Sequence, residues 1–276
     1  MINNKNNIII IGAGNLACSL IDRLDLVNYN LYLIQKNITK LNQLVVNYPY
    51  ANISEELLFK TDKDDIVIIA VKPQDFTSIV KKYNNLINNS IIVSLMVGIN
   101  IDLIINKLNC NRVVRLMPNI LSSVGYSSSG IFFSNSINDL ERNNIINIFK
   151  CIGKVYLLSD EQQMSAFVAV ASSSPGFLLF FLENMVKTSI NLGYNQGMIE
   201  EIYNDIFLGL AKLLKQEDGF SALRFKISSK GGTTEAAIDE FKKQQLADIF
   251  TKAYNSCIDR YNKISEEVEL VIDEKI

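Results

Sequence analysis

Residues Asn7–Leu24, NIIIIGAGNLACSLIDRL, decide the fold of the first half of the chain. The run Ile8–Ile11 is apolar and β-branched, which predicts a buried strand. The residues from Gly12 to Ala17 then fit the pattern G-x-G-x-x-A, and leucine and isoleucine recur after them at helical spacing. The stretch therefore predicts a strand, a tight glycine turn and a helix.

This turn has the composition of a dinucleotide-binding site. Gly12 allows the tight turn, Gly14 leaves room for a pyrophosphate, and Ala17 lets the helix pack closely on the strand. Free amides at the helix start, where the helix dipole is positive, favour phosphate. Ordinary glycine-rich turns can match the same pattern, but the place between a strand and a helix favours a dinucleotide site. The residues expected to contact the cofactor here are Gly12, Ala13, Gly14, Asn15 and Leu16.

The end of the second predicted strand, Leu31–Ile34, bears on the choice of cofactor. NAD-preferring sites carry an Asp or Glu there, which binds the ribose 2′-hydroxyl. This sequence instead has Gln35, Lys36 and Asn37, with Thr39 close behind. The missing carboxylate and the lysine favour NADPH and leave NADH as the alternative. A solvated loop lysine is the other interpretation of Lys36.

Strands and helices alternate through the first half of the chain. The further predicted strands are Asp65–Val71, Ile91–Leu95, Arg112–Leu116, Tyr126–Phe133 and Gly153–Leu158, and the helices are Leu41–Val46, Ile101–Leu108 and Asp139–Phe149. The alternation predicts an α/β fold with a doubly wound, Rossmann-like sheet. Ligands bind beyond the carboxyl ends of such strands, so Val71, Lys72 and Pro73 are expected near the cofactor.

From about Ser159 the pattern is helical only. The expected helices are Glu161–Phe177, Phe177–Leu192, Ile199–Leu214, Ile238–Gln245 and Ala247–Ser265, with a joint or kink at Ser172–Pro175 and a stop at Gly193. We therefore expect a cofactor-binding domain at 1–159 and a helical domain for substrate binding and dimerisation at 160–276. Apolar helices of this kind often complete their burial against a second subunit.

Composition narrows the function. The net charge is −2 and no basic block stands out, so a nucleic-acid surface is not expected. The chain has no histidine, which removes imidazole as an acid, a base or a metal ligand, and we expect no metal site. Four cysteines without a C-x-x-C pair favour free thiols in a reducing, cytoplasmic setting over disulfides or zinc.

Neither a signal peptide nor a membrane span is expected. The N-terminal MINNKNN is polar. The most apolar later stretch, Ala166–Val186, is interrupted by Ser172–Pro175 and contains Glu183, which fits a membrane span poorly.

The segment Ile227–Thr234, ISSKGGTT, has the composition of an anion-binding loop. Glycine permits the backbone geometry of a nest, and the amides of Gly232, Thr233 and Thr234 can face a carboxylate where a helix starts near Glu235. A threonine hydroxyl can also donate to a reacting group. The alternative is a glycine loop with a threonine N-cap.

Together these motifs resemble the Δ1-pyrroline-5-carboxylate reductase family, whose members catalyse the last step of proline synthesis. The resemblance covers nearly the whole chain and rests on four motifs in family order. They are the glycine turn Ile11–Ala17, A-V-K-P at Ala70–Pro73, R-x-M-P-N at Arg115–Asn119, and S-K-G-G-T-T at Ser229–Thr234.

The sequence departs from the family at a few positions. Ser172 and Ser174 replace glycines of the family's S-G-S-G-P-A-Y. Lys230 replaces the proline of S-P-G-G-T-T, and Ile120-Leu121 replaces Thr-Pro after Asn119. These changes bear on substrate affinity and activity.

The resemblance implies hydride transfer from C4 of NAD(P)H to the C=N carbon of 1-pyrroline-5-carboxylate, giving L-proline. It implies that Thr234 is catalytic, as a hydrogen-bond donor near the imine nitrogen. The substrate residues it implies are Ser228, Ser229, Gly231, Gly232, Thr233, Thr234 and Glu217, the last of which could also be a solvated loop carboxylate. The cofactor residues it adds are Ala70, Val71, Lys72, Pro73, Met117 and Asn119. It also implies a dimer through the C-terminal helices, assembled into a decamer in many members.

Two other functions remain as alternatives. β-Hydroxyacid dehydrogenases use a catalytic lysine in G-x-x-x-K-x-x-x-N, and Lys187 and Asn191 have the K-x-x-x-N spacing, but Glu183 stands where the glycine would be. The pair is also typical of a contact on a helix surface. A protein that binds NADPH but has lost turnover through the serine substitutions is the second alternative.

Overall fold

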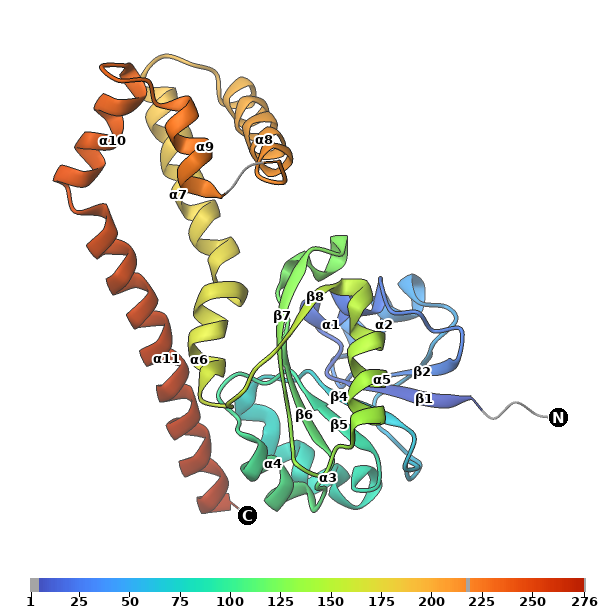
Figure 1. Cartoon of the computed structure of the whole chain (residues 1–276). Helices are drawn as coiled ribbons and strands as arrows, with labels where there is room; N and C mark the ends of the chain where they lie inside the picture. Colours follow the sequence, from blue (N-terminus) through green and yellow to red (C-terminus); the bar gives the residue numbers. More distant parts are fainter. Residues whose placement is uncertain (1–4, 217–218, 276) are drawn as a thin grey trace. The chain divides into compact units, whose positions relative to one another are not determined.

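The computed structural model describes residues 5–216 and 219–275 (Figure 1). Its contacts divide the chain into two compact units. The first, Met1–Ser173 with Cys257–Ile276, holds the sheet, and the second, Ser174–Ser256, holds only helices in its described part. The predicted domain boundary at 159/160 follows the change from strands to helices and stays a prediction.

The first unit is built on an eight-stranded sheet of order β3-β2-β1-β4-β5-β6-β7-β8. The strands are β1 (Asn6–Ile11), β2 (Tyr29–Ile34), β3 (Asn52–Ser54), β4 (Ile66–Ile69), β5 (Ile91–Ser94), β6 (Val113–Met117), β7 (Ser127–Phe133) and β8 (Gly153–Leu157). The predicted α/β class is confirmed, and the sheet is mostly parallel. Among the described strands the exception is the antiparallel pair of β6 and β7, and β8 runs parallel to β7. The reason is a short link, the 3₁₀ helix η2 (Ile120–Val124), in place of a crossover helix.

Helices cover both faces of this sheet. Alternate strand residues point to opposite faces, so Ile8 and Ile10 enter one core cluster while Ile9 and Ile11 enter another. All four isoleucines are at most 2% exposed, which is why the strand appears as one apolar run. One face is covered by α1 (Asn15–Ile21), α2 (Ile38–Asn47) and α5 (Asp139–Phe149), and the other by α3 (Phe76–Ile87), α4 (Ile101–Leu108) and the end of α11 (Leu246–Lys275).

The end of α11 belongs to the first unit because its apolar residues pack there. Val268 and Ile272 are buried in the same cluster as α3 and α4. The side chain of Asn100, which caps α4, donates to Glu269 at 3.1 Å, and the Ser265 hydroxyl donates to the carbonyl of Gly98. The helix therefore runs past the predicted end at Ser265 and contributes to the core of the sheet domain.

The helical run that follows the sheet is continuous but contains a wide turn. It consists of α6 (Gln163–Phe167), the π-helical turn η4 (Val168–Ser172) and α7 (Ser174–Asn191). In the π turn the amide of Ser173 donates to the carbonyl of Val168, five residues back, at 2.9 Å. The predicted joint near Ser172–Pro175 falls where η4 gives way to α7.

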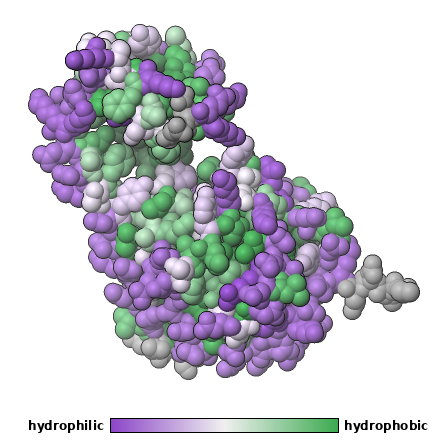
Figure 2. Space-filling model, viewed as in Figure 1, coloured by the Kyte–Doolittle hydropathy of each residue, from purple (hydrophilic) through white to green (hydrophobic). Residues whose placement is uncertain are grey.

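The second unit continues with α8 (Gln196–Leu213), α9 (Phe220–Ile227), α10 (Thr233–Lys243) and the first part of α11. Sequence analysis missed α9. The helix that it expected to start near Glu235, with apolar spacing over Ile238–Gln245, is α10, which starts at Thr233. Gln245, with φ +54, separates α10 from α11. Figure 2 shows apolar residues at the surface of this helical unit. Those with more than half of their surface exposed include Leu178, Leu179, Phe180, Leu208 and Phe225.

Candidate cofactor cleft and substrate cradle

The glycine turn after β1 fits only glycine at its first position. Gly12 has φ +91, and a Cβ there would lie 2.6 Å from Cγ1 and 2.9 Å from the backbone nitrogen of Val71. The Gly12 amide also donates to the carbonyl of Ile34 at 2.9 Å. The ends of β1, β2 and β4 therefore converge on this residue.

Gly14 is suited to this turn for a different reason, which is the free space beside its Cα. Its φ of −93 suits any residue, and a Cβ there would meet only the carbonyl oxygen of Gly12, at 3.9 Å. The missing side chain faces free space above the start of α1. Gly14 is the N-cap of that helix, no side chain caps it, and no acidic residue lies in its first turn. The free amides of the first turn can therefore receive an anion such as a pyrophosphate.

Gln35 and Asn37 are occupied with the backbone of the protein. The side-chain nitrogen of Gln35 donates to the carbonyl of Ala13 at 3.1 Å. The side-chain oxygen of Gln35 accepts from the backbone amide of Asn37 at 3.1 Å. Asn37 caps α2 by accepting from the amide of Lys40 at 3.0 Å. These side chains fix the glycine turn and the start of α2 relative to each other.

A cleft of about 490 Å³ lies at this end of the sheet. It brings together the predicted residues Gly12, Gly14, Asn15, Leu16, Gln35, Lys36, Asn37, Ala70, Val71 and Lys72. Four other predicted cofactor residues do not line it. Ala13 is buried and meets Gln35 through its carbonyl, and Pro73 begins the 3₁₀ helix η1 (Pro73–Asp75). Met117 and Asn119 lie at the end of β6, where both are buried.

The cleft carries more lysine than the sequence motifs indicated. Lys36, Lys40, Lys72 and Lys82 line it, together with the carboxylates of Glu55 and Asp75. The Lys36 ammonium pairs with Asp75 at 3.1 Å, and Lys82 pairs with Glu56, whose hydrogen bond raises the pKa of Lys82. Sequence analysis missed Lys40 and Lys82. The signal for Lys40 was its place one turn after Lys36 at a helix start.

Asn119 links the R-x-M-P-N motif to the π turn. Its side-chain nitrogen donates to the carbonyl of Ala171 at 2.9 Å, and its oxygen accepts from the Leu121 amide at 3.0 Å. The neighbouring residue Ser172 stands where the family has glycine. Its hydroxyl is buried without a hydrogen-bond partner among the described residues. The other replaced glycine, Ser174, has its hydroxyl 3.1 Å from that of Tyr254.

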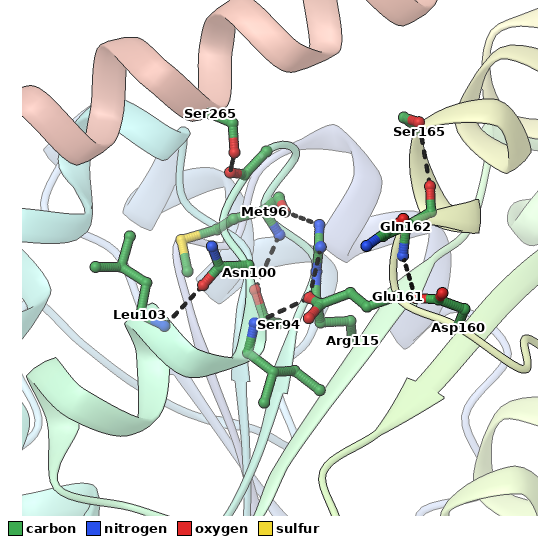
Figure 3. A network of polar contacts seen from close by, with 12 residues as sticks. Ser94, Met96, Asn100, Leu103, Arg115, Asp160, Glu161, Gln162, Ser165 and Ser265 are labelled. Carbon is green, nitrogen blue, oxygen red and sulfur yellow. Dashed lines mark hydrogen bonds and ion pairs between the residues drawn. The ribbon is translucent and has the colours of Figure 1, made fainter.

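Arg115, the first residue of that motif, is the largest fully buried side chain among the described residues and is 2% exposed. Figure 3 shows its contacts with Met96 and Glu161. Its guanidinium donates to Glu161 at 2.8 Å, to the Tyr261 hydroxyl at 2.7 Å and to the Met96 carbonyl at 3.4 Å. Glu161 in turn accepts the amide of Ile101 at 2.9 Å. The network joins β6, the start of α4, the segment before α6 and α11, and sequence analysis did not anticipate it.

The cysteine and acidic side chains of the described residues do not indicate a reactive thiol or a metal site. All four cysteines are free, and burial raises the pKa of the Cys18, Cys110 and Cys151 thiols, which disfavours reactive thiolates. Within residues 5–216 and 219–275, no group of three or more Cys, Asp or Glu side chains could hold a metal ion.

The glycine–threonine loop precedes α10 in the second unit. The helix starts at Thr233, its N-cap is Gly232, and no side chain caps it, so the threonine N-cap interpretation is wrong. The carbonyl of Ser229 accepts the amide of Gly232 at 3.0 Å, and Gly231 has φ +75. This is the pattern of a type II turn, in which proline favours the position held here by Lys230. The substitution keeps the turn and loses only the rigidity of proline.

Ser228 closes the preceding helix, α9, through its amide, which donates to the carbonyl of Arg224 at 3.0 Å. The amides in the first turn of α10 have no intrahelical acceptor, which suits a carboxylate. Glu217, the remaining predicted substrate residue, lies outside the described residues.

Comparison with known proteins agrees with this arrangement. Residues 161–264 match the family model "Pyrroline-5-carboxylate reductase dimerisation", and residues 7–98 match "NADP oxidoreductase coenzyme F420-dependent". The chain is 32% identical over 270 residues to the pyrroline-5-carboxylate reductase of Staphylococcus aureus, covering 94% of this chain and 97% of that protein.

Solved structures agree in fold. The pyrroline-5-carboxylate reductase of Coxiella burnetii has a TM-score of 0.81 at 25% identity and covers 95% of this chain and 99% of its own. The pyrroline carboxylate reductase of Plasmodium falciparum, solved with NADP bound, has a TM-score of 0.78 at 17% identity, covering 96% and 100%. At that identity it supports the fold alone.

A glycine turn over a lysine-lined cleft, on a mostly parallel sheet, defines an NADP-binding oxidoreductase domain. The 32% identity to the Staphylococcus aureus enzyme, over 94% of this chain, then shows to which oxidoreductase family the chain belongs. The chain belongs to the pyrroline-5-carboxylate reductase family.

Proposed function

We propose that this protein reduces 1-pyrroline-5-carboxylate to L-proline with NADPH. The observation that carries the proposal is the presence of two separate anion-receptive glycine turns in a member of this family. One lies at the start of α1, beside the lysine-lined cleft, and suits a dinucleotide. The other lies at the start of α10 and suits a small carboxylate.

The cleft residues fit NADPH. NADPH supplies a hydride from C4 of its nicotinamide when bound. Gly14 and the first-turn amides of α1 would hold the pyrophosphate, for which Gly14 leaves open space. Lys36 and Lys40 would face the 2′-phosphate, because they stand where NAD-preferring sites carry a carboxylate. Met117 and Asn119 stay predicted cofactor residues.

The loop before α10 would bind the substrate carboxylate. The amides of Thr233 and Thr234 would donate to it, while Ser228, Ser229, Gly231 and Gly232 shape the loop. Holding the ring in this way is worth up to roughly 7–11 kcal/mol of the barrier. The hydroxyl of Thr234 would accept a hydrogen bond from the N–H of the imine, in place of the donation that the family resemblance implied. Because a hydroxyl is a poor general acid, the form reduced would be the already protonated imine.

The substitution Thr234→Ala tests this role. It is expected to lower kcat/KM for pyrroline-5-carboxylate by about 10–100-fold, because a hydrogen bond to a charged group is worth roughly 1.5–3 kcal/mol. The Kd for NADPH, measured by fluorescence titration, should stay the same. Thr234→Ser keeps the hydroxyl and should retain most of the activity. Loss of NADPH binding in Thr234→Ala would count against the assignment.

The substitution Lys36→Ala tests the cofactor preference. We expect the KM for NADPH to rise about tenfold, since one charge-assisted contact to the 2′-phosphate is lost, while the KM for NADH stays within about twofold. Both values come from the same initial-rate assay, so NADH serves as the internal control. An equal rise for both cofactors would place Lys36 away from the 2′-phosphate.

We propose that the protein forms a dimer through its helical unit. No residue of α7 is buried within the chain, although this helix carries Leu178, Leu179 and Phe180, each at least 55% exposed. A second copy would cover these side chains. Assembly of dimers into a decamer stays a prediction, testable by light scattering.

The same helical region bears on the cellular location. By length and composition alone, the run Gln163–Asn191 is apolar enough to cross a membrane, because it contains an 18-residue window with a mean hydropathy of 1.7. Because this run lies within the residues that match the dimerisation family, we propose a subunit contact and a cytoplasmic protein.

A further inference from the structure

Glu235 holds the loop that precedes α10. Its carboxylate accepts the amide of Gly231 at 2.6 Å. In an ordinary capping box, the acidic residue at the third helical position accepts the amide of the N-cap residue. Here that amide, on Gly232, already donates to the carbonyl of Ser229, so the carboxylate reaches one residue further back.

This contact decides which amides of the loop are free. The Gly232 amide donates within the turn, to the carbonyl of Ser229, and the Gly231 amide donates to Glu235. The donors left over are those in the first turn of α10, including Thr233 and Thr234. Gly231 is held at φ +75. In a free loop, glycine can adopt this conformation and many others. Without the carboxylate, the loop loses the bond that selects this conformation.

We propose that Glu235 is a positioning residue for substrate binding. It fixes the glycine turn so that the amides of Thr233 and Thr234 are presented together to the substrate carboxylate. It does this from the first turn of α10, without contact to the reacting atoms. This inference rests on the proposed function of the loop as the substrate cradle.

Steady-state kinetics with three variants test the inference. Glu235→Ala removes the acceptor, Glu235→Gln keeps an acceptor oxygen without the charge, and Asp239→Ala is the control. Asp239 lies one turn further along the same helix, where it pairs with Lys242 at 2.6 Å on the surface. The control therefore loses a carboxylate of the same helix that does not contact the loop.

We expect Glu235→Ala to raise the KM for pyrroline-5-carboxylate about tenfold, the equivalent of one lost hydrogen bond to a charged group. The KM for NADPH should not change, because the cofactor cleft lies in the other unit. Glu235→Gln should recover most of the substrate affinity, and Asp239→Ala should match the wild type. Equal substrate KM values in Glu235→Ala and Asp239→Ala would overturn the inference.

Amide hydrogen exchange provides a readout that does not depend on turnover. Peptides covering residues 229–235 should exchange faster in Glu235→Ala than in the wild type or Asp239→Ala, because the Gly231 amide loses its acceptor. Unchanged exchange would also overturn the inference. A wild-type protein without turnover would contradict the proposed function, and the exchange experiment would still decide whether Glu235 holds the loop.

Discussion

The substitution Gly12→Ala is expected to abolish NADPH binding and to destabilise the sheet unit by at least about 1–3 kcal/mol, the usual cost of a non-glycine residue in such a conformation. The new Cβ would lie 2.9 Å from the backbone nitrogen of Val71, so a strand end must move and not merely a side chain. That movement would disturb the ends of β1 and β4 together, and with them the turn that receives the pyrophosphate.

The substitution Gly14→Ala is the matched control for this prediction. Its Cβ would enter open space at an ordinary φ of −93, so the free energy of unfolding without cofactor should change by less than about 1 kcal/mol. NADPH binding should still weaken, because the methyl group occupies the space proposed for the pyrophosphate. Chemical denaturation and NADPH titration of both variants measure the two effects. Equal stability of the two variants would contradict the role assigned to Gly12.

The substitution Arg115→Met is expected to destabilise the sheet unit by about 3 kcal/mol, the lower end of the range for breaking a buried ion pair. The loss leaves Glu161, whose side chain is 22% exposed, without its cation, and leaves the Tyr261 hydroxyl without its donor. The partial exposure of Glu161 argues for the lower end, because water screens part of the unpaired charge.

Two further variants separate this network from a surface ion pair. Arg260→Ala removes the residue next to Tyr261 on the same helix. Arg260 pairs with Glu267 at the surface, where water screens the pair, so this variant should lose far less stability than Arg115→Met. Adding Glu161→Gln to Arg115→Met should recover part of the lost stability, since glutamine still accepts the Ile101 amide and buries no charge. Denaturant unfolding reports all of these values. A loss in Arg115→Met no larger than in Arg260→Ala would show that the network is not a structural centre.

Local pattern was enough to predict most strands of the sheet unit, although it did not predict the helix α3. The β-branched runs predict strands because each strand is buried on both faces, as Ile8 and Ile9 show by entering opposite core clusters. The turn Gly12–Gly14 was readable because its geometry depends on glycine itself. The short strand β3 was not predicted, and β7 was predicted as a strand but not as antiparallel, since pairing and direction depend on contacts distant in sequence.

The candidate site was only partly predictable for the same reason. Lys36 could be predicted because it follows the end of β2, where dinucleotide-binding folds contact the cofactor. Lys82 could not, because it reaches the cleft from α3. Arg115 was visible as part of a motif, but its partners Glu161 and Tyr261 come from distant segments. In the helical unit, apolar spacing marked α7 correctly, yet the side chains it predicts to be buried are exposed in the single chain.

The most direct test of the account is NADPH oxidation by the purified protein in the presence of 1-pyrroline-5-carboxylate, with NADH in parallel and with L-proline identified as the product. We predict turnover with both cofactors and a higher kcat/KM with NADPH. Protein that binds NADPH but gives no proline with either cofactor would contradict the proposed reductase activity. It would then favour a homologue that has lost turnover, with Ser172 and Ser174 as the first positions to return to glycine.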